Sequence, residues 1–270
     1  MIPSTVRYHR AASLEDALDA LSEPEARALA GGQSLLPVMK LRLARPSLLV
    51  DVGHLDLAGV ELANGAVRIG ALTTWDALAL APELAGPAFG VVSECASGIG
   101  DLQVRNRGTL GGSLAHADPA SDMPAVLLAL GADVRLRSQR GERTLAVAEL
   151  FQGPFTTALA EGELVTEAVV PAPPPGSGAA YASVEHPASG FALAGAAALV
   201  RADGSTTIAV TGIGSRPHLL DAGDDPEAVL AGVEVFGDRF TPDEYRRDLA
   251  ATVVRRAVAR ARERAGEGRP

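Results

Sequence analysis

The segment Arg107-Gly108-Thr109-Leu110-Gly111-Gly112-Ser113-Leu114-Ala115-His116-Ala117-Asp118-Pro119-Ala120-Ser121-Asp122 carries three closely spaced glycines. Because glycine has no Cβ, positions 108, 111 and 112 allow positive φ, and successive backbone N–H groups can converge there on an anion. The segment therefore predicts a phosphate cradle. A tight turn is an equally simple explanation of these glycines taken alone.

A second glycine segment, Ala30-Gly31-Gly32-Gln33-Ser34-Leu35-Leu36, comes earlier in the chain. It follows a short apolar run and leads into residues that can form a helix, whose free N–H groups and dipole favour a phosphate. Two such segments fit a ligand with two phosphates better than a ligand with none.

Composition limits the classes of protein to consider. The chain has 270 residues, 47% of them hydrophobic, which is enough for one or two domains with buried cores. Its one cysteine, Cys95, excludes a disulfide framework and a cysteine-ligated iron–sulfur cluster held within this chain. A net charge of -9 argues against a nucleic-acid-binding protein. Because no long apolar run or signal peptide is recognisable, we expect a cytoplasmic protein with no membrane span.

Hydrophobic patterning divides the chain into two parts. Strands alternate with short helices up to Pro171, as in an α/β or α+β layered domain, and Ser13 is expected to cap a helix that ends at Leu21. The proline-rich segment 171–178 is the clearest domain boundary, because prolines favour an extended backbone and the glycines that follow make it flexible. We expect a first domain over residues 1–175 and a second over residues 176–270.

The second domain is predicted to be α+β. Three strand-like runs suit a small antiparallel sheet, namely 179–184, 191–200 and 206–212. A short helix is expected to begin at Asp225, and a long helix is expected from Tyr245 to Arg264 with apolar residues at a spacing of four. The arginines of the long helix could face a partner or nucleic acid, although a solvated helix face is the commoner reason for such a run.

Three other kinds of site are disfavoured by the sequence. The segment Gly98-Ile99-Gly100-Asp101-Leu102-Gln103 has two glycines of a dinucleotide fingerprint, but Gln occupies the third position and a helical pattern precedes it. His116, Asp118 and Asp122 have no second His or Cys nearby to complete a zinc site. The hydrolase motif Gly-x-Ser-x-Gly is absent from the sequence.

Three blocks together resemble one family. Residues 30–42, Ile69-Gly70-Ala71-Leu72-Thr73-Thr74 and residues 103–122 are similar, in order and spacing, to the FAD-binding medium subunit of molybdenum hydroxylases. The resemblance extends over essentially the whole chain and is greatest to the carbon monoxide dehydrogenase type within the xanthine dehydrogenase family. It implies an α+β fold in which a p-cresol methylhydroxylase-type FAD-binding domain, made of two α/β subdomains, precedes a small C-terminal domain with an antiparallel sheet and helices.

The resemblance also implies which residues hold the flavin. It places one pyrophosphate loop on Ala30, Gly31, Gly32, Gln33, Ser34 and Leu35, and another on Thr109, Gly111, Gly112 and Ser113. His116 and Asp118 would support the flavin indirectly. The Asp122 carboxylate would contact the adenine-side ribose or its neighbourhood, with capping of the helix ahead of Pro124 as a second role. Leu164 or Val165, together with Phe191, would lie beside the flavin ring, although a phenylalanine more often belongs to a core.

The implied activity is that of an oxidoreductase subunit that binds FAD noncovalently and contributes no catalytic residue or metal ligand of its own. In the family scheme a molybdopterin large subunit oxidises the substrate, an iron–sulfur small subunit with 2Fe-2S clusters relays electrons, and the FAD delivers them to an external acceptor. Two alternatives stay open, a self-contained flavin-dependent oxidoreductase and a flavin-free assembly module.

Overall fold

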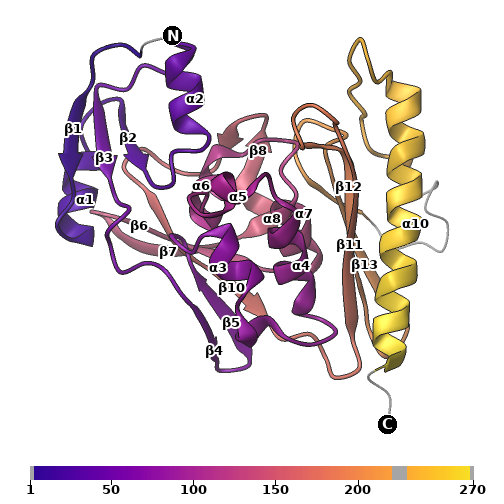
Figure 1. Cartoon of the computed structure of the whole chain (residues 1–270). Coiled ribbons are helices and arrows are strands. Elements are labelled where there is room, and N and C mark those ends of the chain that lie inside the picture. The colour runs from indigo at the N-terminus through magenta and orange to yellow at the C-terminus, as the bar shows by residue number, and fades with distance from the viewer. Residues whose placement is uncertain (1–2, 221–229, 268–270) are drawn as a thin grey trace.

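The computed structural model describes residues 3–220 and 230–267. These residues form a three-stranded, a five-stranded and a four-stranded sheet with helices packed around them, and a two-stranded ribbon (Figure 1). The mixture of helices with largely antiparallel sheets confirms the expected α+β class. The short helix expected at Asp225 lies outside the described residues. No helix in residues 3–220 and 230–267 is both long enough and apolar enough to cross a membrane.

The N-terminal sheet is parallel and has the strand order β1-β3-β2. Its elements are β1 (Arg7–Arg10), α1 (Leu14–Leu21), β2 (Ala26–Leu29), α2 (Leu35–Lys40) and β3 (Leu48–Asp51). Ser13 caps α1 as predicted, because its hydroxyl accepts a hydrogen bond of 3.1 Å from the N–H of Asp16. The first glycine segment follows the carboxyl end of β2, which is the edge at which open α/β sheets bind ligands.

The central sheet is antiparallel, with the strand order β4-β5-β10-β6-β7. Its strands are β4 (Val60–Ala63), β5 (Ala66–Gly70), β6 (Asp133–Ser138), β7 (Gly141–Ala146) and β10 (Leu164–Pro171). Alternation along β5 and β6 buries Val67, Ile69, Val134 and Leu136 in the main core. A register shift in β10 between Val165 and Glu167 lets Val165 and Ala168 face the same core although they are three residues apart.

Short helices cover the core face of the central sheet and separate it from the C-terminal sheet (Figure 1). They are α3 (Trp75–Ala79), η1 (Pro82–Leu84), α4 (Gly90–Gly98), α5 (Leu102–Arg105), α6 (Leu110–His116), α7 (Met123–Ala129) and α8 (Val147–Leu150), and the ribbon is β8 (Phe151–Gly153) with β9 (Thr156–Thr157). Every residue of α7 is buried. Gly98 ends helix α4, so the glycines at 98 and 100 do not follow a strand and a dinucleotide fingerprint is excluded there.

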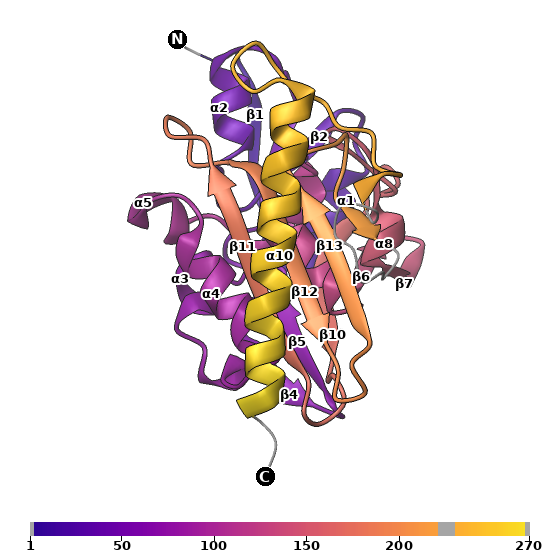
Figure 2. The same cartoon turned by 90° about the vertical axis from the view of Figure 1, so that its right-hand side faces the viewer.

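The C-terminal sheet has the order β11-β12-β13-β14, and the long helix α10 crosses its outer face (Figure 2). The elements are β11 (Gly178–Glu185), β12 (Ala192–Val200), β13 (Thr206–Thr211), β14 (His218–Leu220) and α10 (Asp243–Glu267). Strand β12 is buried on both faces, since Ala197 and Leu199 belong to the main core while Ala196 and Ala198 pack in the α10 core. This double burial explains its unbroken run of small apolar residues.

Candidate functional site

The two glycine segments touch each other. A Cβ built on Gly31 would lie 1.9 Å from the carbonyl oxygen of Arg107 and 3.1 Å from the Cα of Gly108. No residue with a side chain fits at position 31 without separating the two backbones, since real Cβ atoms do not come this close to backbone atoms. Segments far apart in the sequence therefore meet at one place, between the N-terminal sheet and helices α5 and α6.

The first segment presents free hydrogen-bond donors. Gly32 takes a φ of +74°, which turns the chain from β2 into α2. The N–H groups of Gly32, Gln33 and Ser34 donate no hydrogen bond within the described part of the chain, and the Ser34 hydroxyl does not cap α2. Gln33 is exposed, whereas Ala30, Ser34 and Leu35 are half-buried. Clustered N–H groups beside a hydroxyl are the donors that a phosphate group requires.

The second segment differs from the sequence prediction. Gly108, Gly111 and Gly112 do not take the positive φ that glycine allows. Gly111 donates its N–H to the Ala71 carbonyl at 2.8 Å, and the N–H of Gly112 donates to Thr109 Oγ1 at 3.2 Å. The Gly111 amide fastens the first turn of α6 to the residue that follows β5, and the Gly112 amide bonds to the N-cap of α6 itself, so neither stands free.

Close packing explains the glycines of the second segment. A Cβ on Gly111 would lie 2.5 Å from the Cβ of Ala71, and one on Gly108 would lie 2.8 Å from Trp75 Nε1. The glycines therefore let α6 approach the strand and the tryptophan, and this approach carries Arg107 against Gly31. Ser113, on the same helix, is half-buried.

The link between α6 and α7, residues 117–122, contains the predicted site residues Asp118 and Asp122. It directly follows a third, His116, the last residue of α6. The rings of His116 and Phe155 lie 5.2 Å apart, and burial lowers the pKa of His116. Asp118 Oδ1 accepts a 2.9 Å hydrogen bond from the N–H of Ala120. Both side chains thus contact neighbouring residues of the fold, Phe155 for His116 and Ala120 for Asp118.

Asp122 has a role that the sequence did not indicate. Its side chain does not cap α7, so the capping prediction is wrong. Instead its Oδ1 accepts a hydrogen bond of 2.5 Å from the hydroxyl of Tyr181 on β11. Burial raises the pKa of Asp122 to about 6, although the Tyr181 hydrogen bond opposes this shift.

The three residues predicted beside the flavin ring lie in different surroundings. Val165 is buried in the main core. Leu164 is partly buried and packs against the core of the N-terminal sheet, and Phe191, in the turn between β11 and β12, is 47% exposed. Leu164 and Phe191 thus keep apolar surface that a ligand could cover, whereas the side chain of Val165 is already enclosed.

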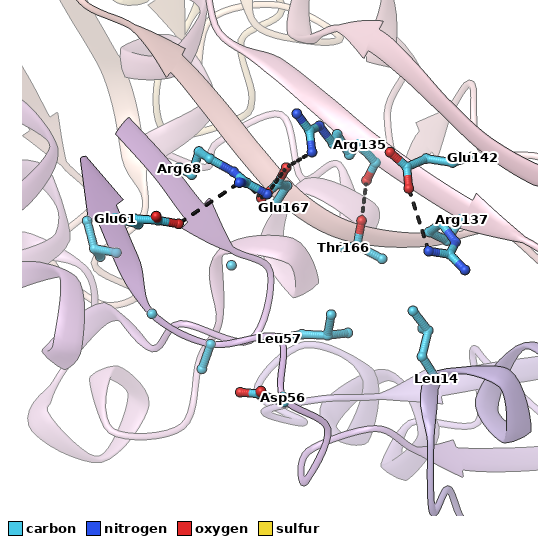
Figure 3. A pocket seen from close by; sticks show the side chains of 14 residues that line it. Leu14, Asp56, Leu57, Glu61, Arg68, Arg135, Arg137, Glu142, Thr166 and Glu167 are labelled. Atoms are coloured by element: carbon cyan, nitrogen blue, oxygen red, sulfur yellow. Dashed lines mark hydrogen bonds and ion pairs between the residues drawn. The ribbon is translucent and has the colours of Figure 1, made fainter. Parts of the chain in front are cut away.

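A cavity of about 370 Å³ lies elsewhere, on the charged face of the central sheet (Figure 3). Glu167 lies between two arginines there, at 2.9 Å from Arg68 and 2.8 Å from Arg135. The Arg68 guanidinium donates two hydrogen bonds to this carboxylate, which raise the pKa of Arg68. The lining residues include none of the predicted flavin-site residues. Glu167 forms ion pairs with Arg68 and Arg135 across strands β5, β10 and β6.

Metal binding and thiol chemistry find no support in the geometry. Within residues 3–220 and 230–267, no three His, Cys, Asp or Glu side chains gather as a metal ion would require. Cys95 is buried, and burial raises the pKa of its thiol well above the ordinary value.

Tyr181 and Thr211, which contact the link between α6 and α7, were not identified from the sequence. Both lie on strands and follow the alternation of a buried sheet, so their patterns are those of core residues. One signal was available, since Gly195 interrupts the alanines of β12 at the position where a Cβ would lie 2.1 Å from Tyr181 Oη.

Comparison with known proteins places these features in a family. Residues 4–173 match the FAD binding domain in molybdopterin dehydrogenase. The chain is 36% identical over 287 residues to the carbon monoxide dehydrogenase medium chain of Afipia carboxidovorans, covering 98% of this chain and 99% of that one. It is 39% identical over 259 residues to the glyceraldehyde dehydrogenase medium chain of Sulfolobus acidocaldarius, covering 94% and 88%.

Solved structures agree with the sequence comparison. A chain of the Cu,Mo-CO dehydrogenase in its cyanide-inactivated form superposes with a TM-score of 0.92 at 36% identity, covering 98% of this chain and all of that one. A chain of quinoline 2-oxidoreductase from Pseudomonas putida 86 superposes with a TM-score of 0.91 at 29% identity, covering 98% and 99%. The chain therefore belongs to the family of FAD-binding medium subunits of molybdenum-containing hydroxylases and dehydrogenases.

Proposed function

We propose that this chain binds one FAD noncovalently and, within a larger complex, passes electrons from an iron–sulfur subunit to an external acceptor. A separate molybdopterin subunit of the same complex carries out the substrate oxidation. The observation that carries the proposal is the contact between the two glycine segments, which places the free N–H groups of residues 32–34 beside the second segment. The medium-chain names of its relatives support the assignment to a multi-subunit complex.

The residues present fit a flavin dinucleotide. The N–H groups of Gly32, Gln33 and Ser34 and the Ser34 hydroxyl would hold a phosphate, and Gly31 keeps the two segments close enough to enclose it. Leu164 and Phe191 offer apolar surface for the ring. When bound, FAD supplies one-electron and two-electron transfer between the donor protein and the acceptor.

The chemistry of the chain itself is limited to binding and positioning. Cys95 is one buried thiol and cannot ligate a cluster, so clusters that deliver electrons must belong to a partner. His116 contacts the Phe155 ring and Asp118 accepts a hydrogen bond from Ala120 within the link, so we assign neither residue a role in acid–base chemistry on an organic substrate.

Flavin release on acid precipitation tests the noncovalent FAD. The purified chain, saturated with FAD and then desalted, should show flavin absorption, and trichloroacetic acid should release the yellow colour into the supernatant. Colour that stays with the pellet would contradict the noncovalent attachment. A chain that remains colourless after saturation would instead favour a flavin-free assembly module.

A further inference from the structure

The link between α6 and α7 is fastened to the C-terminal sheet by hydrogen bonds that cross from one part of the chain to another. Thr211 Oγ1, on β13, lies 2.9 Å from the carbonyl oxygen of Pro119 and 2.7 Å from that of Ser121. The N–H of Gly212 donates to the Pro119 carbonyl at 2.8 Å. Thr211 has no exposed surface, so its hydroxyl bonds are shielded from competing water.

Tyr181 supplies the fourth of these contacts. Its hydroxyl reaches Asp122 through the space left by Gly195, where any Cβ would overlap the oxygen at 2.1 Å. The tyrosine side chain is 8% exposed and belongs to the main core, so its ring is held by packing. The hydroxyl therefore has a fixed position from which to orient the Asp122 carboxyl.

The C-terminal side of this connection is itself anchored. Gly212 takes a φ of +80°, and a Cβ there would lie 2.5 Å from the Ala192 carbonyl oxygen. Arg246 on α10 donates to the Gly212 carbonyl at 2.8 Å and forms an ion pair of 2.9 Å with Asp238. The link is thus hydrogen-bonded to β11 and to the end of β13, and through Gly212 it is held by α10, although it continues directly from the glycine segment of α6.

We propose that Tyr181 and Thr211 are positioning residues for FAD, which act by holding the link and its Asp122 carboxyl in the binding arrangement before the flavin arrives. This inference rests on the proposed function. The C-terminal sheet would then contribute to flavin affinity without supplying the phosphate donors, because a link fixed in advance loses less conformational freedom on binding. Removal of either hydroxyl should loosen the link while the sheet, which keeps its apolar packing, stays folded.

The test uses the full chain and the variants Tyr181→Phe and Thr211→Val, which come from different strands and keep side-chain volume. We expect each variant to raise the Kd for FAD roughly fivefold to tenfold, as the loss of one buried hydrogen bond would. In the flavin-free protein, amide hydrogen exchange should accelerate at residues 118–122 and stay unchanged in β11 to β13. Thr211→Ser, which keeps the hydroxyl, should retain the wild-type affinity.

Matched controls remove similar groups away from the link. Tyr245→Phe changes an exposed tyrosine on α10, and Thr206→Val changes the opposite end of β13. Both should leave FAD affinity unchanged. If either link variant does not fold, the other still decides the matter, since each removes a separate bond.

The outcomes separate this inference from the proposed function. Wild-type affinity in Tyr181→Phe and Thr211→Val, with FAD bound by the parent chain, overturns the positioning role alone. Weakened binding in Thr211→Ser equal to that in Thr211→Val also overturns it, because the hydroxyl would then not be responsible. A parent chain that takes up no FAD overturns both the proposed function and this inference.

Discussion

Asp122 combines a partly buried carboxyl with a hydrogen bond to Tyr181. Burial raises its pKa from 3.8 to about 6, the Tyr181 hydrogen bond lowers it in part, and the charge of Glu185 raises it further. Because the folded-state pKa is higher than the unfolded one, the stabilising contribution of this group is complete below about pH 4 and is lost as the pH rises through about 6. At neutral pH the fold therefore contains a partly buried carboxylate that costs stability.

Replacement of this carboxyl by an amide should remove the pH dependence. In flavin-free Asp122→Asn, the amide oxygen can still accept from Tyr181, and no charge develops. We expect the unfolding free energy of the variant, relative to that of the parent, to increase by about 1–2 kcal/mol as the pH rises from 5 to 8. Urea unfolding at several pH values measures this, and a stability difference that stays constant with pH would contradict the raised pKa.

Gly31 is the residue at which the two glycine segments meet. Gly31→Ala places a Cβ where the Arg107 carbonyl oxygen lies, at 1.9 Å, so the two backbones must separate. We expect FAD affinity to fall at least roughly tenfold, since about 1.4 kcal/mol of lost complementarity changes a binding constant by that factor. Fluorescence titration with FAD measures the effect.

Gly98→Ala provides the matched control for Gly31→Ala. Gly98 ends α4 without positive φ, and an added Cβ would meet no atom within 4 Å. Alanine is also the better helix former, so this variant should keep both stability and FAD affinity. Equal FAD binding by Gly31→Ala and Gly98→Ala would show that contact between the two segments does not matter for the flavin.

At the scale of elements, helix α6 depends on a threonine cap. Thr109 Oγ1 accepts from the N–H of Gly112 at 3.2 Å, and Thr74 caps α3 in the same way at 3.3 Å from the N–H of Ala77. The two threonines also pair with each other in an isolated antiparallel bridge. The starts of α3 and α6 are therefore held side by side.

This pair of caps allows a comparison within one chain. Thr109→Ala and Thr74→Ala should each lower the free energy of unfolding by about 1 kcal/mol, which is the usual effect of losing a threonine N-cap. Only Thr109→Ala should also weaken FAD binding, because α6 carries the second glycine segment. Thermal melts measure the stability of both variants, and FAD titrations measure their affinity. An equal loss of affinity in both would mean that α6 contributes no more to flavin binding than α3 does.

At the scale of the whole molecule, the chain is expected to depend on partners. Its one cysteine is buried, so we expect the chain to rely on the proposed flavin for redox chemistry. The isolated FAD-loaded chain should not oxidise organic or gaseous substrates. In the native host it should co-purify with subunits that contain molybdenum and iron, measured by elemental analysis. Isolation as a free monomer that turns over substrate would support a self-contained flavin oxidoreductase instead.

Elements with a local cause could be predicted from the amino-acid sequence. Ser13 before an amphipathic run specified α1, and the spacing of apolar residues in α10 predicted Val253, Ala257 and Ala261 on the buried face. The resemblance of three motif blocks was sufficient to predict the family and the FAD-binding class. These features depend on the order of residues along one segment, which a single sequence records completely. The division at residues 175 and 176 and the roles of the site residues in binding stay predictions.

The contacts between distant segments became known from the folded structure. Gly111 was expected to need positive φ or a close approach to a phosphate, yet its φ is not positive, and Ala71, from a distant segment, leaves no room for a Cβ. Asp122 was expected to cap a helix, yet it accepts a hydrogen bond from Tyr181, which is 59 residues away in the sequence. The room available for a side chain and its hydrogen-bond partner both depend on how separate elements pack. The pattern of polar and apolar residues along the chain does not specify which side chain will lie opposite another.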